Sequence, residues 1–177
     1  MFDRLRGVLS FNLETINEIE HDPSALSQAF IVVIVSSLVA AIGGGFGQVL
    51  FGVGIGTDSN NNPALKFVSI VVWAIVAWFL WAVITQFIGT KFFNGEATIP
   101  EMMRVIGFAY APLVIQVFSF IPFLGFLFVF GAAAWSIALV FVSVREGLDI
   151  STGSALWVAL IGGVVYLIGM GVILTIF

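Results

Sequence analysis

Charged residues are scarce in this sequence. Asp, Glu, Lys and Arg make up 9% of the 177 residues, whereas a soluble domain carries about 25%. Hydrophobic residues reach 60%, and the mean hydropathy is +1.17. So small a polar share cannot cover the surface of a fold in water. The chain is therefore expected to be an integral membrane protein with no soluble domain of its own.

Cysteine is absent and histidine occurs once. The absence of cysteine excludes disulfides, thiolate nucleophiles and thiolate metal sites. His21 lies between Glu20 and Asp22, which together could hold a metal only weakly, and a solvated helix end is the simpler interpretation. No Ser-His-Asp set, phosphate-binding loop with its lysine, or dinucleotide fingerprint is present. The sequence therefore predicts no catalytic residue, metal or cofactor, and no enzyme.

The charges that are present also exclude nucleic acid as a partner. The net charge is −4, and no basic stripe runs along the chain. The start, Met1–Arg6, does not lead into an apolar run with a cleavage site, so it is not a signal peptide and is expected to be retained.

Long apolar runs fill most of the chain and predict an all-α bundle of five transmembrane helices. Asp22-Pro23 is expected to start the first of them, and Thr98 with Glu101 forms a capping box before the third. Pro112 predicts a kink near residues 108–112, and Gly147 is expected to cap the fourth span. The spans are expected at about 26–50, 66–90, 103–121, 124–144 and 154–176, in a transmembrane domain of residues 23–177.

Residues 1–22 are expected to form a separate amphipathic segment. Apolar residues recur every three or four positions between residues 5 and 19, which predicts one or two helices. A break is expected at Ser10–Asn12, with Asn12 capping the second helix. The segment either lies along the membrane surface or packs on the loops beside it.

Basic residues indicate the orientation. Arg4, Arg6, Lys91, Arg104 and Arg145 fall on one side of the predicted spans and Lys66 alone on the other. Under the positive-inside rule, the N-terminus is cytoplasmic and the C-terminus outside. We expect a multi-pass protein of the cell (plasma) membrane.

Three groups of residues are candidates for function. A cluster at the inner ends of the spans either anchors the loops or docks a partner: Glu101, Arg104, Arg145, Glu146 and Asp149. Within it, the two arginines are expected to pair with the acidic residues. Polar residues beside the expected kink either bond between helices or line a path: Tyr110, Pro112, Gln116 and Ser119. Glycines at four-residue spacing predict close helix packing, within the chain or with another chain: Gly43, Gly47, Gly52 and Gly56.

The segments Gly107–Pro112 and Ile121–Gly125 resemble the Yip (Ypt-interacting-protein) domain family. The stretches from Leu9 to Ser24 and from Arg145 to Leu156 are similar to its short prokaryotic members. The resemblance implies five spans, a cytoplasmic N-terminus and a C-terminus outside. The resemblance also implies that eukaryotic relatives bind Rab-type GTPases, and these relatives carry a longer cytosolic N-terminal region. Rab binding is not carried over, because only about 22 residues precede the first span.

The spans contain no ionisable residue in their central portions, which argues against ion pumps and proton-coupled transporters. The main hypothesis is therefore a non-enzymatic scaffold or accessory subunit that associates with the lipid bilayer and with other membrane proteins or itself. The alternative is a small transporter or channel for a neutral or lipidic solute.

Overall fold

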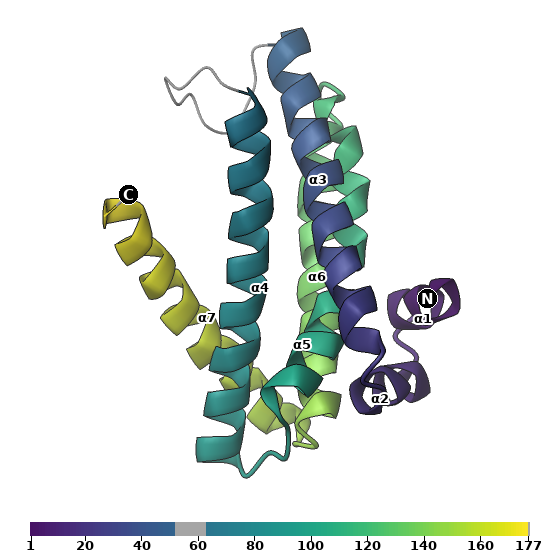
Figure 1. Cartoon of the computed structure of the whole chain (residues 1–177), viewed down its shortest axis with the longest axis vertical. Coiled ribbons are helices and arrows are strands. Elements are labelled where there is room, and N and C mark those ends of the chain that lie inside the picture. The colour runs from purple at the N-terminus through teal and green to yellow at the C-terminus, as the bar shows by residue number, and fades with distance from the viewer. Residues whose placement is uncertain (52–62, 177) are drawn as a thin grey trace.

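The protein is helical throughout the part of the chain that the computed structural model describes (Figure 1). This part comprises the backbone of residues 1–51 and 63–176, with the side-chain surroundings of residues 1–44, 68, 71–165 and 168. No strand occurs within it, as predicted. The elements are α1 (Phe2–Leu9), α2 (Leu13–His21), α3 (Ala25–Phe51), α4 (Pro63–Phe93), α5 (Ile99–Phe108), the 3₁₀ helix η1 (Ala111–Phe120), α6 (Gly125–Gly147) and α7 (Thr152–Ile176).

Four helical segments are long and apolar enough to cross a membrane. They are Ala25–Gly44, Val71–Phe93, Ile99–Phe120 and Gly125–Gly147, each with 20 to 23 residues. They fall on the first four predicted spans. The fifth predicted span falls on α7, whose described apolar part, Thr152–Val165, is shorter. Figure 1 shows α7 leaning away from α3 and α6; it packs on α4 and α6 through its first half.

Two short helices precede the first span, as the apolar periodicity predicts. The Asn12 side chain accepts a hydrogen bond from the Thr15 backbone N–H at 3.1 Å, so Asn12 caps α2. Val8, Ile16 and Ile19 are fully buried. They belong to the same apolar core as the residues of α3 and α5. The two helices are therefore part of the packed bundle and not a loose extension.

The third span changes helix type halfway. The prediction placed a kinked α-helix over residues 103–121. Instead, α5 ends at Phe108 and a 3₁₀ helix of 10 residues follows. Pro112 causes the break, because it lacks an N–H and its ring clashes with the preceding turn. A 3₁₀ helix rises about 2.0 Å per residue, whereas an α-helix rises about 1.5 Å. The helix η1 is therefore thinner and longer than an α-helix of the same residues.

Trp78 lies at the centre of the core. It is 1% exposed, and its indole N–H donates to the Met103 carbonyl at 3.0 Å. Its ring lies 6.2 Å from that of Phe30. Because Trp78 lies on α4 and its partners lie on α3 and α5, it joins three elements. A buried tryptophan needs such an acceptor for its N–H.

Two predicted helix ends differ from the structure. Asp22 does bind the Ser24 N–H at 2.8 Å, but α3 begins at Ala25, after Pro23 rather than at it. Gly147 is not the cap of α6. The left-handed residue is Asp149, with φ 52°. Gly147 is instead the last residue of α6, where an added Cβ would lie 3.2 Å from Val105 and 3.4 Å from Met102.

Candidate functional site

The ends of five helices meet on one side of the bundle. We call this region the charged end: the last turn of α2, the loop Asn94–Thr98, the first two turns of α5, the last turn of α6 and the loop Leu148–Ser151 (Figure 1). It holds most of the ionisable residues that follow the N-terminal segment. The residues of the predicted docking cluster all lie here.

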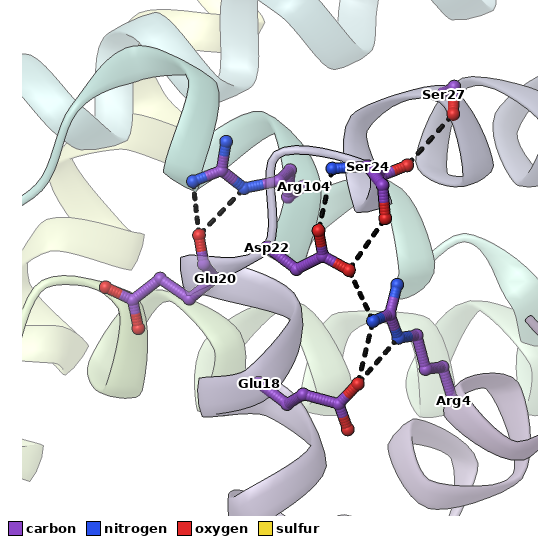
Figure 2. A network of polar contacts seen from close by, with 7 residues as sticks. All are labelled: Arg4, Glu18, Glu20, Asp22, Ser24, Ser27 and Arg104. Carbon is purple, nitrogen blue, oxygen red and sulfur yellow. Dashed lines mark hydrogen bonds and ion pairs between the residues drawn. The ribbon is translucent and has the colours of Figure 1, made fainter.

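Arg104 ties the N-terminal segment to the bundle. Its guanidinium is 8% exposed and donates through Nε, at 2.8 Å, and through Nη2 to the backbone carbonyl of Glu20 (Figure 2). Glu20 lies in the last turn of α2, where carbonyls have no partner within the helix. A cation there also complements the helix dipole. Glu101 lies 3.7 Å from the Arg104 guanidinium, so the predicted pairing of these two residues is confirmed.

The carboxyl group of Glu20 is buried as well. The residue is 3% exposed, and its Oε2 atom has no hydrogen-bond partner among the described residues. Figure 2 shows the carboxyl turned away from Arg104. Burial, opposed by His21, raises the pKa of Glu20 from 4.5 to about 7. Asp149 and Glu101 raise the pKa further, while Arg104 lowers it. The group is thus partly protonated at neutral pH.

This buried carboxyl predicts a pH-dependent stability. The folded state holds the Glu20 proton more tightly than the unfolded state, so stability falls as pH rises from about 4.5 to about 7 and stays low above. Glu20→Gln should remove this loss, making the protein about 1–3 kcal/mol more stable at pH 8 with little effect at pH 5. Thermal unfolding in mild detergent at both pH values measures it.

The Glu20 test must account for two neighbouring ionisable residues, His21 and Asp22, and it needs a control variant. The pKa of exposed His21 is raised by its hydrogen bond to the Asn17 carbonyl and next by Glu20. The Gln variant retains His21 and this hydrogen bond but removes the contribution of Glu20. The pKa of Asp22 is lowered to about 2, below the range used. Glu14→Gln removes an exposed carboxylate from the same helix and should change neither value. An equal gain at pH 5 and pH 8 would contradict the assignment.

A second ionic network fastens α1 to α2. Arg4 Nη2 lies 2.7 Å from Glu18 Oε1 and 2.5 Å from Asp22 Oδ2, and Arg4 Nε lies 3.0 Å from Glu18 (Figure 2). Asp22 also accepts from Ser24 Oγ at 2.7 Å. The Ser24 hydroxyl and backbone N–H, followed by Arg4, lower the pKa of Asp22. One carboxylate thereby joins α1, α2 and the start of α3.

The two loops of the charged end are bonded together. The Glu96 N–H donates to the Leu148 carbonyl at 3.1 Å, and the Gly95 N–H to the Gly89 carbonyl at 3.0 Å. Gln86 Nε2 donates to the Ala97 carbonyl at 3.1 Å. The predicted capping box closes the loop: Thr98 Oγ1 accepts from the Glu101 N–H, and Glu101 accepts from the Thr98 N–H. The loops are therefore held in one conformation.

The predicted docking cluster divides into buried and accessible members. Arg104 points inward, while Glu101 is occupied by the capping box. Arg145 and Glu146 pair with each other and are partly exposed, in agreement with the predicted pairing. Asp149 is exposed. The accessible surface thus consists of Arg145, Glu146 and Asp149, together with the exposed loop residues Asn94 and Glu96.

The residues of the predicted polar path lie on η1 and at its start. Tyr110 precedes η1, Pro112 is buried in its first turn, and Gln116 and Ser119 are partly buried. Several hydroxyl groups elsewhere in the spans bond to carbonyls instead of lining a path. Ser37, Thr85 and Thr90 donate to carbonyls of their own helices, and Ser136 donates to the Ala109 carbonyl.

Of the four glycines predicted to pack closely, Gly43 is the one whose surroundings are described. An added Cβ on it would lie 2.2 Å from the Gln116 carbonyl oxygen and 2.8 Å from Val117 Cα. Gly43 therefore lets α3 approach the backbone of η1. The surroundings of Gly47, Gly52 and Gly56 lie outside the described residues.

Sequence reasoning missed the roles of Arg4 and Glu20. The spacing of Glu20 placed it among other acids of an amphipathic segment, and nothing in that pattern marks it as buried. Arg104 reaches a backbone carbonyl 84 residues away, and a carbonyl carries no sequence signature. Within the described residues, no three His, Cys, Asp or Glu side chains come together as a metal site.

Comparison with known proteins identifies the family. The sequence model of the Yip1 domain family matches residues 6–173, which is nearly the whole chain. Neither the curated proteins nor the solved structures contain a match. Yip1-family members are non-enzymatic membrane trafficking proteins. The family agrees with the four apolar spans of the fold and with the prediction that the chain is not an enzyme. This chain is a non-enzymatic, multi-pass membrane protein and belongs to the Yip1 family.

Proposed function

We propose that this protein is a scaffold or accessory subunit of a membrane complex and that its charged end is the docking surface. The observation that supports this most is the bonding of two loops into one polar face. The Glu96 N–H to Leu148 carbonyl bond holds Glu96 beside the loop that carries Asp149. Both side chains are exposed. A surface fixed before binding loses little entropy when a partner docks.

The proposal includes five spans, with the charged end cytoplasmic and the C-terminus outside the cell membrane. Arg4, Arg104 and Arg145 belong to the charged end or to the helices beside it, whereas Lys66 lies in the first turn of α4, at the opposite end. This distribution supports a cytoplasmic charged end under the positive-inside rule. The course of α7, which runs from the charged end toward the opposite end in Figure 1, supports it as the fifth span and a C-terminus on the other side.

The docking face predicts a partner whose recovery depends on its charges. Glu96→Gln with Asp149→Asn removes two carboxylates without changing shape, and asparagine tolerates the left-handed φ of Asp149. We expect partner recovery to fall about fivefold, equivalent to about 1 kcal/mol. Purification of the tagged protein from its native membrane, after crosslinking and with mass spectrometry of co-purifying proteins, measures this.

Glu14→Gln is the matched control for the docking experiment, because Glu14 is exposed on α2, away from the bonded loops. It should leave the yield of partner unchanged. A lone monomer in both the original protein and the variants would overturn the docking proposal. A Rab-type GTPase is not expected among the partners.

Transport of a neutral or lipidic solute is the second candidate function. Its support is η1, because a long 3₁₀ stretch within a span often marks a hinge, and Gln116 and Ser119 lie on it. Flux into liposomes that falls on Gln116→Leu would favour transport. If no solute of a broad panel entered the liposomes, transport would be excluded as the function.

A further inference from the structure

A polar cavity lies where α1, α2 and the start of α3 meet. Its volume is about 340 Å³. Its walls carry four kinds of polar group: a guanidinium, carboxylates, hydroxyls and an amide. The lining residues that matter here are Asp3, Arg4, Thr15, Glu18, Ser24 and Gln28. The cavity is separate from the bonded loops of the charged end, because its lining residues lie on α1, α2 and at the start of α3.

Two buried polar atoms on this cavity have no partner in the described structure. They are Arg4 Nη1, a donor, and Gln28 Oε1, an acceptor. Arg4 uses Nε and Nη2 on Glu18 and Asp22, and no contact to its third nitrogen is drawn in Figure 2. Buried polar atoms in proteins are nearly always satisfied. A ligand that satisfies both must offer an acceptor oxygen to Arg4 and a hydrogen-bond donor to Gln28.

The charges around the cavity favour a ligand that carries both signs. Asp3 and Glu18 supply two carboxylates, and the cationic residues of the lining are Arg4 and the amino-terminal Met1, so the charges already present balance. A phosphate alone would face the carboxylates, and an ammonium alone would leave Arg4 Nη1 unsatisfied. A zwitterion with a phosphate and a primary ammonium adds no net charge and can engage both atoms.

The position of the cavity indicates a lipid as the source. The first span begins at Ala25, so Ser24 and Gln28 lie at its first turn, the depth of lipid headgroups. Beside the cavity, Phe2 is 83% exposed and Met1 41%. Exposed apolar side chains on a short amphipathic helix insert at the headgroup and acyl-chain boundary. A headgroup in the cavity would therefore have its acyl chains within reach of the bilayer.

We propose that this cavity binds the headgroup of phosphatidylethanolamine from the adjoining leaflet. The phosphate accepts a hydrogen bond from Arg4 Nη1. The ammonium donates to Gln28 Oε1 and to the carboxylates of Asp3 and Glu18. Phosphatidylcholine cannot donate from its trimethylated nitrogen, and phosphatidylglycerol has no cation. The site thereby selects an amino-phosphate headgroup, and the bound lipid holds α1 against the membrane.

Native mass spectrometry of the detergent-purified full chain tests the site. The protein is delipidated and incubated with phosphatidylethanolamine, phosphatidylcholine or phosphatidylglycerol at equal concentration. We expect phosphatidylethanolamine to be retained about tenfold better than the other two lipids. Gln28→Leu and Asp3→Asn should each lower its apparent affinity about tenfold, the equivalent of about 1.4 kcal/mol. Both variants leave the ion pairs of Arg4 intact.

Ser27→Ala is the matched control, because Ser27 lies on the same turn of α3 and bonds to the Ser24 carbonyl without lining the cavity. It should retain the lipid. Equal retention of all three lipids, or unchanged binding in both cavity variants, would overturn the site. If a hundredfold excess of soluble glycerophosphoethanolamine displaced the bound phosphatidylethanolamine, the assignment of a membrane lipid as the ligand would be overturned. Failure to displace it supports that assignment. Circular dichroism confirms that each variant is folded.

Discussion

Arg104→Ala should destabilise the protein by about 3–5 kcal/mol. The guanidinium is buried, and it satisfies the last turn of α2 through the Glu20 carbonyl. Removing one partner of a buried ionic contact leaves the other groups desolvated and unpaired, which carries a cost of this size. The Glu20 carboxyl, already raised in pKa by burial, would also lose its nearby cation. We expect a lower melting temperature in mild detergent and release of α2 from α5.

Limited trypsin digestion detects that release directly. Cleavage after Arg4 and Arg6 should become faster in Arg104→Ala, because α1 and α2 are then held only by their own contacts. Arg6→Ala serves as the matched control for the melting temperature and for cleavage after Arg4: Arg6 is an exposed arginine, and surface substitutions usually change stability by less than about 0.5 kcal/mol. Unchanged melting and unchanged cleavage in Arg104→Ala would show that the contact with Glu20 contributes little.

Gly43→Ala should lower stability by about 1–3 kcal/mol, although alanine is the better helix former. A Cβ at this position would lie 2.2 Å from the Gln116 carbonyl oxygen and 2.8 Å from Val117 Cα. Both are backbone atoms of η1, which cannot move aside as a flexible side chain can. The two elements must separate, and overpacking of this kind costs about 1–3 kcal/mol. Thermal unfolding in detergent measures the loss.

The neighbouring glycine provides the control for the Gly43 prediction. An added Cβ on Gly44 meets nothing within 4 Å. Gly44→Ala should therefore keep or raise stability, by up to about 1 kcal/mol from helix propensity. The opposite signs separate the effect of contact with η1 from the general effect of replacing glycine in α3. If both variants were equally stable, α3 and η1 would not be in close contact in solution.

The local features of this fold could be read from the sequence because their causes are local. Asn12 caps α2 by a bond to a residue three positions along, and the capping box of Thr98 and Glu101 has the same span. The break in the third span follows from the covalent structure of Pro112. The apolar runs located the four long spans without any knowledge of contacts. In each case, the interacting atoms lie within a few residues of one another.

The candidate site could be predicted only in part. The sequence placed Arg104, Arg145 and Asp149 at one end of the bundle, because span boundaries fix which residues share an interface. It gave no indication that Arg104 is buried and Asp149 exposed. Pairing with Glu101 and Glu146 was predictable from short spacing. The partner that matters most to Arg104 is a backbone carbonyl, and every residue of the chain has one.

The sequence by itself determined that this protein crosses a membrane, is helical, and lacks the side chains of an enzyme. Composition and periodicity are sufficient for these properties, because a segment that crosses a bilayer must bond its backbone groups internally, which an apolar helix does. The tertiary structure alone decided the 3₁₀ form of η1, the burial of Glu20 and the cavity around Arg4. Each depends on atoms brought together from distant segments, such as Gly43 against Gln116 and Glu20 against Arg104. Packing and desolvation set these features, and neither is a property of one segment alone.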